Sequence, residues 1–269
     1  MTAINELIRF CYDRGWSQTL YLSVVLVNYL IQIVFLLIYR KKYDLSVGKI
    51  LLAQLFIYPV AYLWMLVLAW VENGFTNWGA NNIVRLFVYV PLINLLAAKL
   101  TKIPVNKLND ISAPCYAFDQ AFGHIVCPLV GCCCGYPSSW GVWNPTTNDI
   151  RFPNQWLECL VALCIWFFLL GYAKKKSYKA DGSCYALFLV LFGVTRFFLE
   201  FLRDNNKLFL GISNLALHAL FMVVVGTIWL FFLAEKEKES KRKAEITQRK
   251  PRIYSPQGAR VGYPKEDKV

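Results

Sequence analysis

The sequence predicts an all-α, polytopic membrane protein with about seven transmembrane helices, its N-terminus outside and its C-terminus in the cytoplasm. Hydrophobic residues make up 57% of the 269-residue chain, and the mean hydropathy is +0.40. A hydrocarbon core of about 30 Å needs about 20 apolar residues per helix. Seven stretches meet or approach that length: 20–39, 50–71, 83–98, 113–134, 156–172, 184–202 and 215–234. The distribution of basic residues supplies the third observation.

The formal net charge of +12 comes mostly from segments that the predicted topology places inside the cell. These segments are 40–49, 99–107, 173–179 and the tail from residue 235, and they hold 22 of the 29 lysines and arginines. The positive-inside rule requires this asymmetry. It supports the two least apolar stretches, 83–98 and 113–134, as real spans. The charge is therefore a topology signal and does not indicate nucleic-acid binding.

Two regions follow from this pattern. Residues 1–234 are predicted to form the transmembrane domain, and residues 235–269 a basic cytoplasmic tail that is partly disordered. The longest outer loop, between the fourth and fifth spans, is rich in Trp, Pro and Asn and is expected at the lipid headgroups. The chain shows no internal repeat, which argues against a transporter.

Ionisable residues inside a bilayer cost several kcal/mol unless they are paired or hydrated, so they are candidates for function. Taken singly, each reads equally well as a structural ion pair or as a side chain that reaches the headgroups. Together they come from five helices and fall in the outer leaflet, which predicts a shared polar cavity. Its arginines suit a phosphate-bearing ligand, of which a phospholipid is the most available. The candidates are Arg85, His124, Glu158 with Asn154 and Gln155 before it, Arg196, Glu200, Arg203 and His218.

Four stretches read together carry a family resemblance. They are "GHIVCPLVGCCCG", "RFPNQWLE", "GVTRFFLEFLRD" and "GISNLALHA". Their order and spacing resemble the prolipoprotein diacylglyceryl transferase family over about residues 108–225. The second and third motifs are fairly specific in combination, although each alone is weak.

The resemblance implies a multi-pass enzyme of the bacterial plasma (inner) membrane with its active site facing the outer leaflet. Such an enzyme moves diacylglyceryl from phosphatidylglycerol to the cysteine thiol of a lipoprotein signal peptide, forming a thioether. No cofactor is expected. By position, the resemblance makes Arg196 the catalytic arginine and matches Glu200, Arg203, Gln155, Glu158, Gly131 and Gly135 to the motifs.

The chain also departs from the family's pattern. His124 stands where the first motif has an arginine, and Phe152 and Asn154 replace a histidine and a serine or threonine of the second. The family's His-Gly-Gly motif is missing, and "NWGANNIVRL", with Arg85, falls at about that place. One hypothesis is an exchange, in which Arg85 supplies the guanidinium and His124 the imidazole. The alternative is a catalytically altered or inactive paralogue that binds phospholipid or assists membrane assembly.

The nine cysteines include three in succession, Cys132 to Cys134. On a helix these three would point about 100° apart and would not share a metal ion easily. His124 and Cys127 have the spacing of two ligands, but no further ligands are evident, so no metal is expected. A disulfide to Cys11 stays open. Close packing is favoured, because residues 131–135 have Gly-x-x-x-Gly spacing. The nucleophile in this type of reaction belongs to the substrate.

Overall fold

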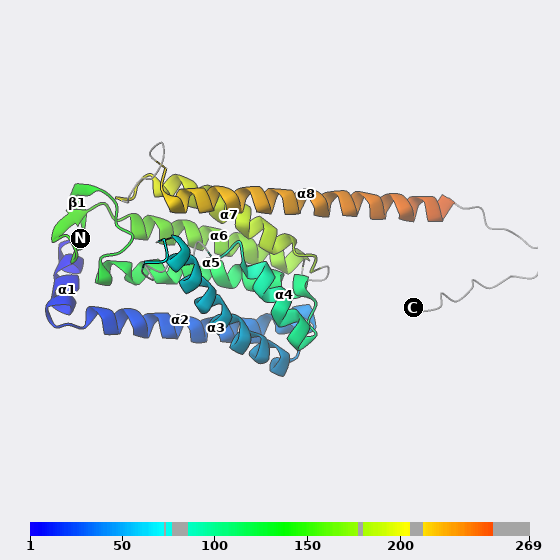
Figure 1. Ribbon diagram of the computed structural model, residues 1–269, viewed down its shortest axis with the longest axis horizontal. Helices are drawn as coiled ribbons and strands as arrows, with labels where there is room; N and C mark the ends of the chain where they lie inside the picture. The colour runs from blue at the N-terminus through cyan, green and yellow to red at the C-terminus, as the bar shows by residue number, and fades with distance from the viewer. Residues whose placement is uncertain (73, 77–85, 177–179, 205–211, 250–269) are drawn as a thin grey trace, which may run out of the picture. The chain divides into compact units, whose positions relative to one another are not determined.

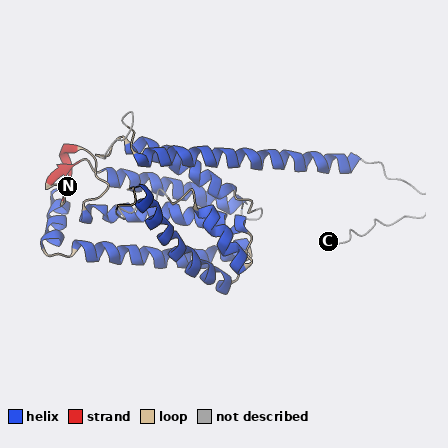
Figure 2. Ribbon diagram, viewed as in Figure 1, coloured by secondary structure: helices blue, strands red, loops and turns tan. Residues whose placement is uncertain are grey.

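The protein is almost entirely helical (Figures 1 and 2). The computed structural model describes residues 1–249 apart from 73, 77–85, 177–179 and 205–211. The elements are α1 (Thr2–Asp13), α2 (Ser17–Tyr39), the short 3-10 helix η1 (Arg40–Tyr43), α3 (Val47–Glu72), α4 (Val90–Thr101), α5 (Val105–Val130), β1 (Pro137–Asn144), β2 (Asp149–Arg151), α6 (Asn154–Lys176), α7 (Ser183–Glu200) and α8 (Asn214–Arg249). The predicted all-α class holds except for the antiparallel hairpin β1–β2, which occupies the long loop after α5.

Five segments of the described chain are long and apolar enough to cross a membrane. They are Ser17–Tyr43, Val47–Val71, Asn154–Lys175, Ser183–Glu200 and Asn214–Glu245. The other two expected spans are not among them. The stretch 83–98 overlaps α4, a shorter apolar helix, and its first residues lie outside the described part of the chain. The stretch 113–134 overlaps α5, which carries more polar residues. The structure thus shows a multi-pass helical protein.

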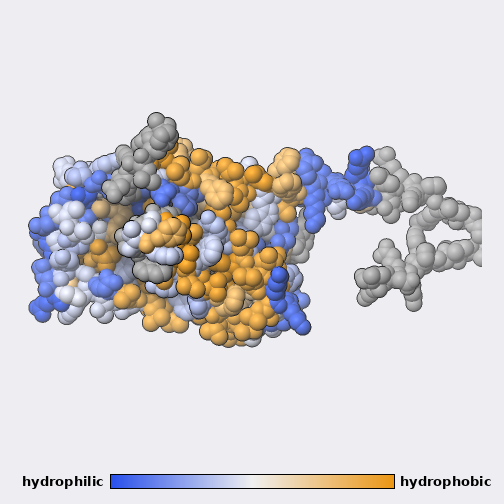
Figure 3. Space-filling model, in the orientation of Figure 1, coloured by the Kyte–Doolittle hydropathy of each residue, from blue (hydrophilic) through white to orange (hydrophobic). Residues whose placement is uncertain are grey.

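Large apolar side chains face outward along the helices, and several polar ones are buried. Leu55 is 72% exposed and Ile38 66%, whereas Asn94 and Asn154 are fully buried. On the face in Figure 3, apolar residues gather over the middle of the helices, and hydrophilic ones lie at the end that carries α1 and β1. This distribution is expected of helices that face lipid and satisfy their polar groups internally.

Helix α5 is the centre of the helical unit, since it packs against α2, α4, α6 and α7. Polar side chains fasten two of these contacts. Asp119 on α5 accepts hydrogen bonds from Asn28 and Gln32 on α2. Asn94 on α4 donates to Asn109 on α5 over 2.8 Å. Such interhelical bonds are worth about 1 kcal/mol each in membranes, and they fix the helix register.

Two glycines let α7 and α8 approach closely. A Cβ on Gly193 would lie 2.7 Å from the carbonyl oxygen of Ala219, and one on Gly226 would lie 2.8 Å from that of Ala186. Small residues at helix interfaces allow this backbone proximity in membrane proteins. The contact places the end of α7 beside the start of α8.

The chain divides into two compact units, Met1–Leu230 and Phe231–Val269. In the second unit, α8 continues to Arg249 as an exposed helix with ion pairs three or four residues apart, such as Glu239 with Lys243 at 2.7 Å. The disorder expected from the sequence falls partly on residues 250–269, which lie outside the described residues.

Helix α7 receives its N-terminal cap from a distant residue. Asp110, buried in α5, accepts hydrogen bonds from the backbone N–H groups of Gly182 (2.9 Å), Cys184 (3.0 Å) and Tyr185 (3.2 Å). The first N–H groups of a helix lack partners within it, and a carboxylate also interacts favourably with the positive end of the helix dipole. Asp110 therefore fixes where α7 begins and holds it against α5.

The substitution Asp110→Ala is expected to lower the free energy of unfolding by about 2–3 kcal/mol, because it leaves three buried donors without an acceptor. The measurement is thermal unfolding of the purified protein in detergent. Asp181→Ala is the matched control, since Asp181 accepts one local bond, from the N–H of Ser183 at 3.1 Å. Equal midpoints for the two variants would contradict the assigned role of Asp110.

Candidate active site

The carboxylate of Glu158, on α6, is the meeting point of the buried polar residues. The side chain of Arg196, from α7, donates to Oε1 over 2.7 Å. Arg203, three residues beyond the end of α7, donates through Nε to Oε1 over 2.7 Å and through Nη2 to Oε2 over 2.8 Å. All three residues are 5% exposed or less. This two-bond fork is the strongest geometry of an arginine–carboxylate pair.

A second carboxylate holds the other side of Arg196. Glu200 Oε2 lies 2.5 Å from Arg196 Nη2, one helical turn along α7. Its other oxygen accepts a hydrogen bond of 2.8 Å from Ser213, just before α8. Arg196 and Glu200, four residues apart on α7, thus form an ion pair. The Arg196 guanidinium is fixed between two carboxylates and cannot rotate freely.

His124, on α5, contacts the same cluster. Its Nε2 lies 2.6 Å from Glu158 Oε2, and its Nδ1 lies 2.6 Å from the carbonyl oxygen of Gln120. Both neighbouring atoms are acceptors, and Glu158 is held by two arginines. Both ring nitrogens of His124 are therefore engaged in this arrangement.

Three buried polar atoms of the cluster have no hydrogen-bond partner among the described residues. They are Nε of Arg196, Oδ1 of Asn154 and Oε1 of Gln155. The amide groups of the two α6 residues are engaged: Asn154 donates to Glu158 over 2.6 Å, and Gln155 donates to the carbonyl oxygen of Cys132 over 3.0 Å. Most buried polar atoms in folded proteins are paired. One unpaired donor and two unpaired acceptors in a single cluster therefore indicate a place for a polar ligand.

The glycines of the first motif do not lie on a helix, so the prediction of a close-packed Gly-x-x-x-Gly helix face is wrong. Helix α5 ends at Val130, and Gly131 follows with φ +70°, in the left-handed region that terminates helices. A Cβ on Gly131 would lie 2.5 Å from both Asn144 Oδ1 and Thr146 Oγ1. Residues 131–135 therefore form a loop pressed against the hairpin.

Gly135 ends this loop beside the second arginine of the site. It forms an antiparallel bridge with Arg203, and a Cβ there would lie 2.9 Å from the Phe152 Cβ and 3.0 Å from the Leu202 carbonyl oxygen. The backbone of the first motif thus lines the segment that carries Arg203. Gly131 and Gly135, the two predicted glycines, thus let the backbone of the loop approach neighbouring segments closely.

Arg151, which was not among the predicted site residues, links the hairpin to the end of α7. Its Nη1 lies 2.5 Å from Asp204 Oδ2, and its Nε lies 2.8 Å from Asp149 Oδ1. The Arg151 guanidinium lowers the pKa of Asp149. The available signal was its position, because Arg151 is the first residue of the stretch "RFPNQWLE" and Asp204 is the last residue of "GVTRFFLEFLRD". The residue after Arg203 is thereby fastened to β2.

Two further predicted site residues are Arg85 and His218. Arg85 lies outside the described residues, so the proposed exchange between Arg85 and His124 stays a prediction. His218 is half-buried on α8, one turn along from Asn214, whose carbonyl oxygen lies 2.9 Å from its Nδ1. The remaining predicted residues come together around Glu158 from α5, α6, α7 and the loops after α5 and α7.

The fold and the site define a multi-pass membrane protein with a buried arginine–carboxylate cluster. A model of the prolipoprotein diacylglyceryl transferase family matches residues 45–232, and the chain belongs to this family.

Individual relatives agree with the family match. The phosphatidylglycerol–prolipoprotein diacylglyceryl transferase of Clostridium tetani is 30% identical over 177 residues, covering 62% of this chain and 67% of the relative. Transferase 2 of Clostridium perfringens is 29% identical over 166 residues, covering 59% and 62%. That of Methylobacillus flagellatus is 31% identical over 156 residues, covering 55% and 59%. The matched part thus spans about two thirds or less of each of these relatives.

The substitution Gly131→Ala is expected to destabilise the protein by about 2 kcal/mol or more, because a Cβ there is strained by the left-handed backbone and clashes with two side chains of the hairpin. Gly123→Ala, within the preceding helix α5, is the matched control. No atom lies within 4 Å of a Cβ at Gly123, and alanine is the better helix former by about 1 kcal/mol. Thermal unfolding in detergent measures both. A Gly131→Ala protein as stable as the control would refute the assigned loop geometry.

Proposed function

We propose that this protein transfers diacylglyceryl from phosphatidylglycerol to the cysteine thiol of a lipoprotein signal peptide. The product is a thioether, and glycerol phosphate leaves. One observation carries the proposal beyond family membership: two buried arginines are held by two carboxylates at the motifs of the family. One of these arginines keeps an N–H that has no partner in the described part of the chain.

The arginines suit the phosphate of the lipid. A guanidinium binds phosphate oxygens through several N–H groups at once. The buried Nε of Arg196 is a donor without a partner among the described residues, and Glu158 and Glu200 fix the plane of its guanidinium. We assign Arg196 as the catalytic arginine, which stabilises the negative charge on the departing glycerol phosphate. Such fixed donors act most strongly in a buried, water-poor site.

The other site residues position the lipid and the arginines. Glu200 orients Arg196, and Glu158 holds Arg196 together with Arg203. The unpaired carbonyl oxygens of Asn154 and Gln155 suit the two hydroxyl groups of a glycerol headgroup.

The remaining predicted residues enter the proposal at the edges of the site. Gly131 and Gly135 shape the loop against which the ligand lies, and His218 contributes to binding from α8. The exchange of roles between Arg85 and His124 remains part of the proposal.

The enzyme is proposed to lie in a bacterial inner membrane with the site facing the outer leaflet. The distribution of lysine and arginine supports this orientation, because the inner segments and the tail hold 22 of the 29 basic residues. The partners are then phosphatidylglycerol, a lipoprotein signal peptide with its lipobox cysteine, and the membrane itself.

The test uses the full chain in phosphatidylglycerol vesicles with a lipobox peptide, and mass spectrometry of the peptide product. The wild type is expected to form the thioether, and Arg196→Lys to reduce the rate by about 100-fold or more, since lysine cannot keep both carboxylates and the phosphate. Arg14→Lys, at an exposed arginine outside the site, is the matched control and should keep the wild-type rate.

Bound phosphatidylglycerol without any thioether product would contradict the proposed activity and support a non-catalytic phospholipid-binding protein. A wild-type rate in Arg196→Lys would refute the assignment of this arginine.

A further inference from the structure

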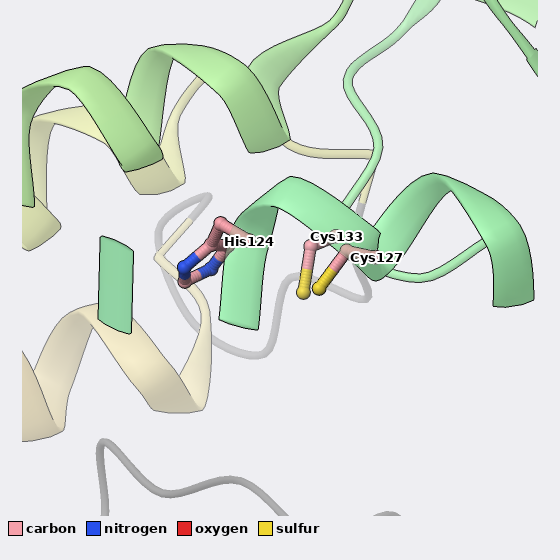
Figure 4. Close-up of side chains that lie close together, drawn as sticks. All are labelled: His124, Cys127 and Cys133. Carbon is pink, nitrogen blue, oxygen red and sulfur yellow. The ribbon is translucent and has the colours of Figure 1, made fainter. Parts of the chain in front are cut away.

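Three side chains with metal-binding atoms lie together beside the cluster. The ligand atoms of His124, Cys127 and Cys133 are all within 4.8 Å of one another, and both cysteines are free thiols (Figure 4). Figure 4 shows the two sulfur atoms side by side, next to the ring of His124. In a tetrahedral zinc site with bonds of about 2.3 Å to sulfur and 2.0 Å to nitrogen, ligand atoms are about 3.5–3.8 Å apart. Shifts of about 1 Å would complete that geometry.

The end of α5 explains how Cys133 can lie beside His124 and Cys127, although a continuous helix would point the neighbouring cysteines in different directions. His124 and Cys127 lie one turn apart on α5, and the helix ends at Val130. Cys133 has φ +60°, which turns the loop back toward the helix. Three consecutive cysteines would not share a metal ion easily if they continued the helix. The structure places Cys133 in the loop, where its sulfur reaches the other two ligands.

The surroundings of His124 favour one ring nitrogen as the ligand. Nδ1 faces the carbonyl oxygen of Gln120, and a metal-bound histidine usually donates its second N–H to such an acceptor. Nε2 is then the ligand atom, and its contact with Glu158 would be replaced by a bond to the metal. Glu158 keeps its bonds to Arg196, Arg203 and Asn154 after that exchange, so the carboxylate is not left unpaired.

We propose that His124, Cys127 and Cys133 bind Zn²⁺ and that the fourth coordination position takes the cysteine thiol of the substrate. One imidazole and two thiolates are a ligand set that zinc accepts, and three protein ligands with one open position are typical of catalytic zinc. This inference rests on the proposed function for the identity of the thiol, while the metal site stands on its own geometry.

The site answers a chemical need of the proposed reaction. The thiolate is the nucleophile, but both nitrogens of His124 and both oxygens of Glu158 are occupied. Zinc removes the need for a dedicated base, because a coordinated thiol loses its proton to water. The sulfur then attacks the glyceryl carbon, the S–C bond forms, and the C–O bond breaks with its electron pair going to the phosphate. Zinc is neither oxidised nor reduced.

Cobalt tests the site directly, because Co²⁺ substitutes for Zn²⁺ and its bonds to thiolates absorb in the near ultraviolet. The full chain in detergent, reduced and freed of metal by a chelator, is titrated with Co²⁺. One ion per chain is expected, with charge-transfer absorption from two thiolates. Cys127→Ser and Cys133→Ser should each lose this absorption. Cys134→Ser is the matched control in the same loop, because its sulfur instead contacts Asn144 at 2.9 Å.

The open position is tested on the unmodified chain, which avoids any effect of substitution on folding. A lipobox peptide should raise the charge-transfer absorption by about half, as two thiolates become three. The same peptide with serine for cysteine should not. A site without cobalt absorption, or a disulfide between Cys127 and Cys133 that persists under reduction, would overturn the metal site. Cobalt binding with no response to the cysteine peptide would overturn the assignment of the open position.

The transferase assay separates this inference from the proposed function. Activity that is unchanged after complete removal of metal would refute a role for zinc in the reaction. Cobalt binding and a peptide response without thioether formation would leave the site standing and contradict the proposed activity instead.

Discussion

The site depends on one buried carboxylate. Glu158 accepts from Arg196 and Arg203 and contacts His124, so it joins α5, α6 and the end of α7 at a single point. Charged side chains buried within a membrane protein are energetically costly unless they are paired. Once paired, each charge holds the others in place, because removing one leaves its partners buried and uncompensated. The arrangement therefore resists rearrangement more than the separate interhelical contacts do.

The surrounding segments hold the charged side chains of the cluster in position. Asp110 fixes the start of α7, and Gly193 and Gly226 bring α7 against α8. At the other end, the loop that ends at Gly135 pairs with Arg203, and Arg151 of the hairpin binds Asp204. Helix α7 is thus held at both ends. The positions of Arg196 and Arg203 follow from contacts made well away from Glu158.

Much of this could be predicted from the sequence. Five of the seven apolar stretches correspond to helices of membrane length, and the pair Arg196–Glu200 follows from its spacing on a helix. The polar residues of α5, α6 and α7 do come together around Glu158, whereas the polar cavity shared by five helices stays a prediction. The spacing of the motifs helps to predict this cluster, because each motif lies near the end of one helix.

The loop of the first motif could not be predicted in the same way. Apolar residues run through 125–130, and the small residues that follow are compatible with a longer helix. The helix ends because Gly131 adopts a left-handed conformation against Asn144 and Thr146. These two residues belong to the hairpin and lie outside the helix that they end. The position of Cys133 beside His124 is a consequence of that tertiary contact, so it could not be predicted from the periodicity of the sequence.

The coupling between Glu158 and Arg203 tests most directly whether this carboxylate organises the site. The measurement is a double-mutant cycle with Glu158→Gln, Arg203→Gln and the double variant, each followed by reversible unfolding in detergent. A coupling free energy of about 2 kcal/mol or more is expected, because each single variant strands a buried charge that the double variant removes. Effects that add to within about 0.5 kcal/mol would show that the two residues act independently and would contradict the central role of Glu158.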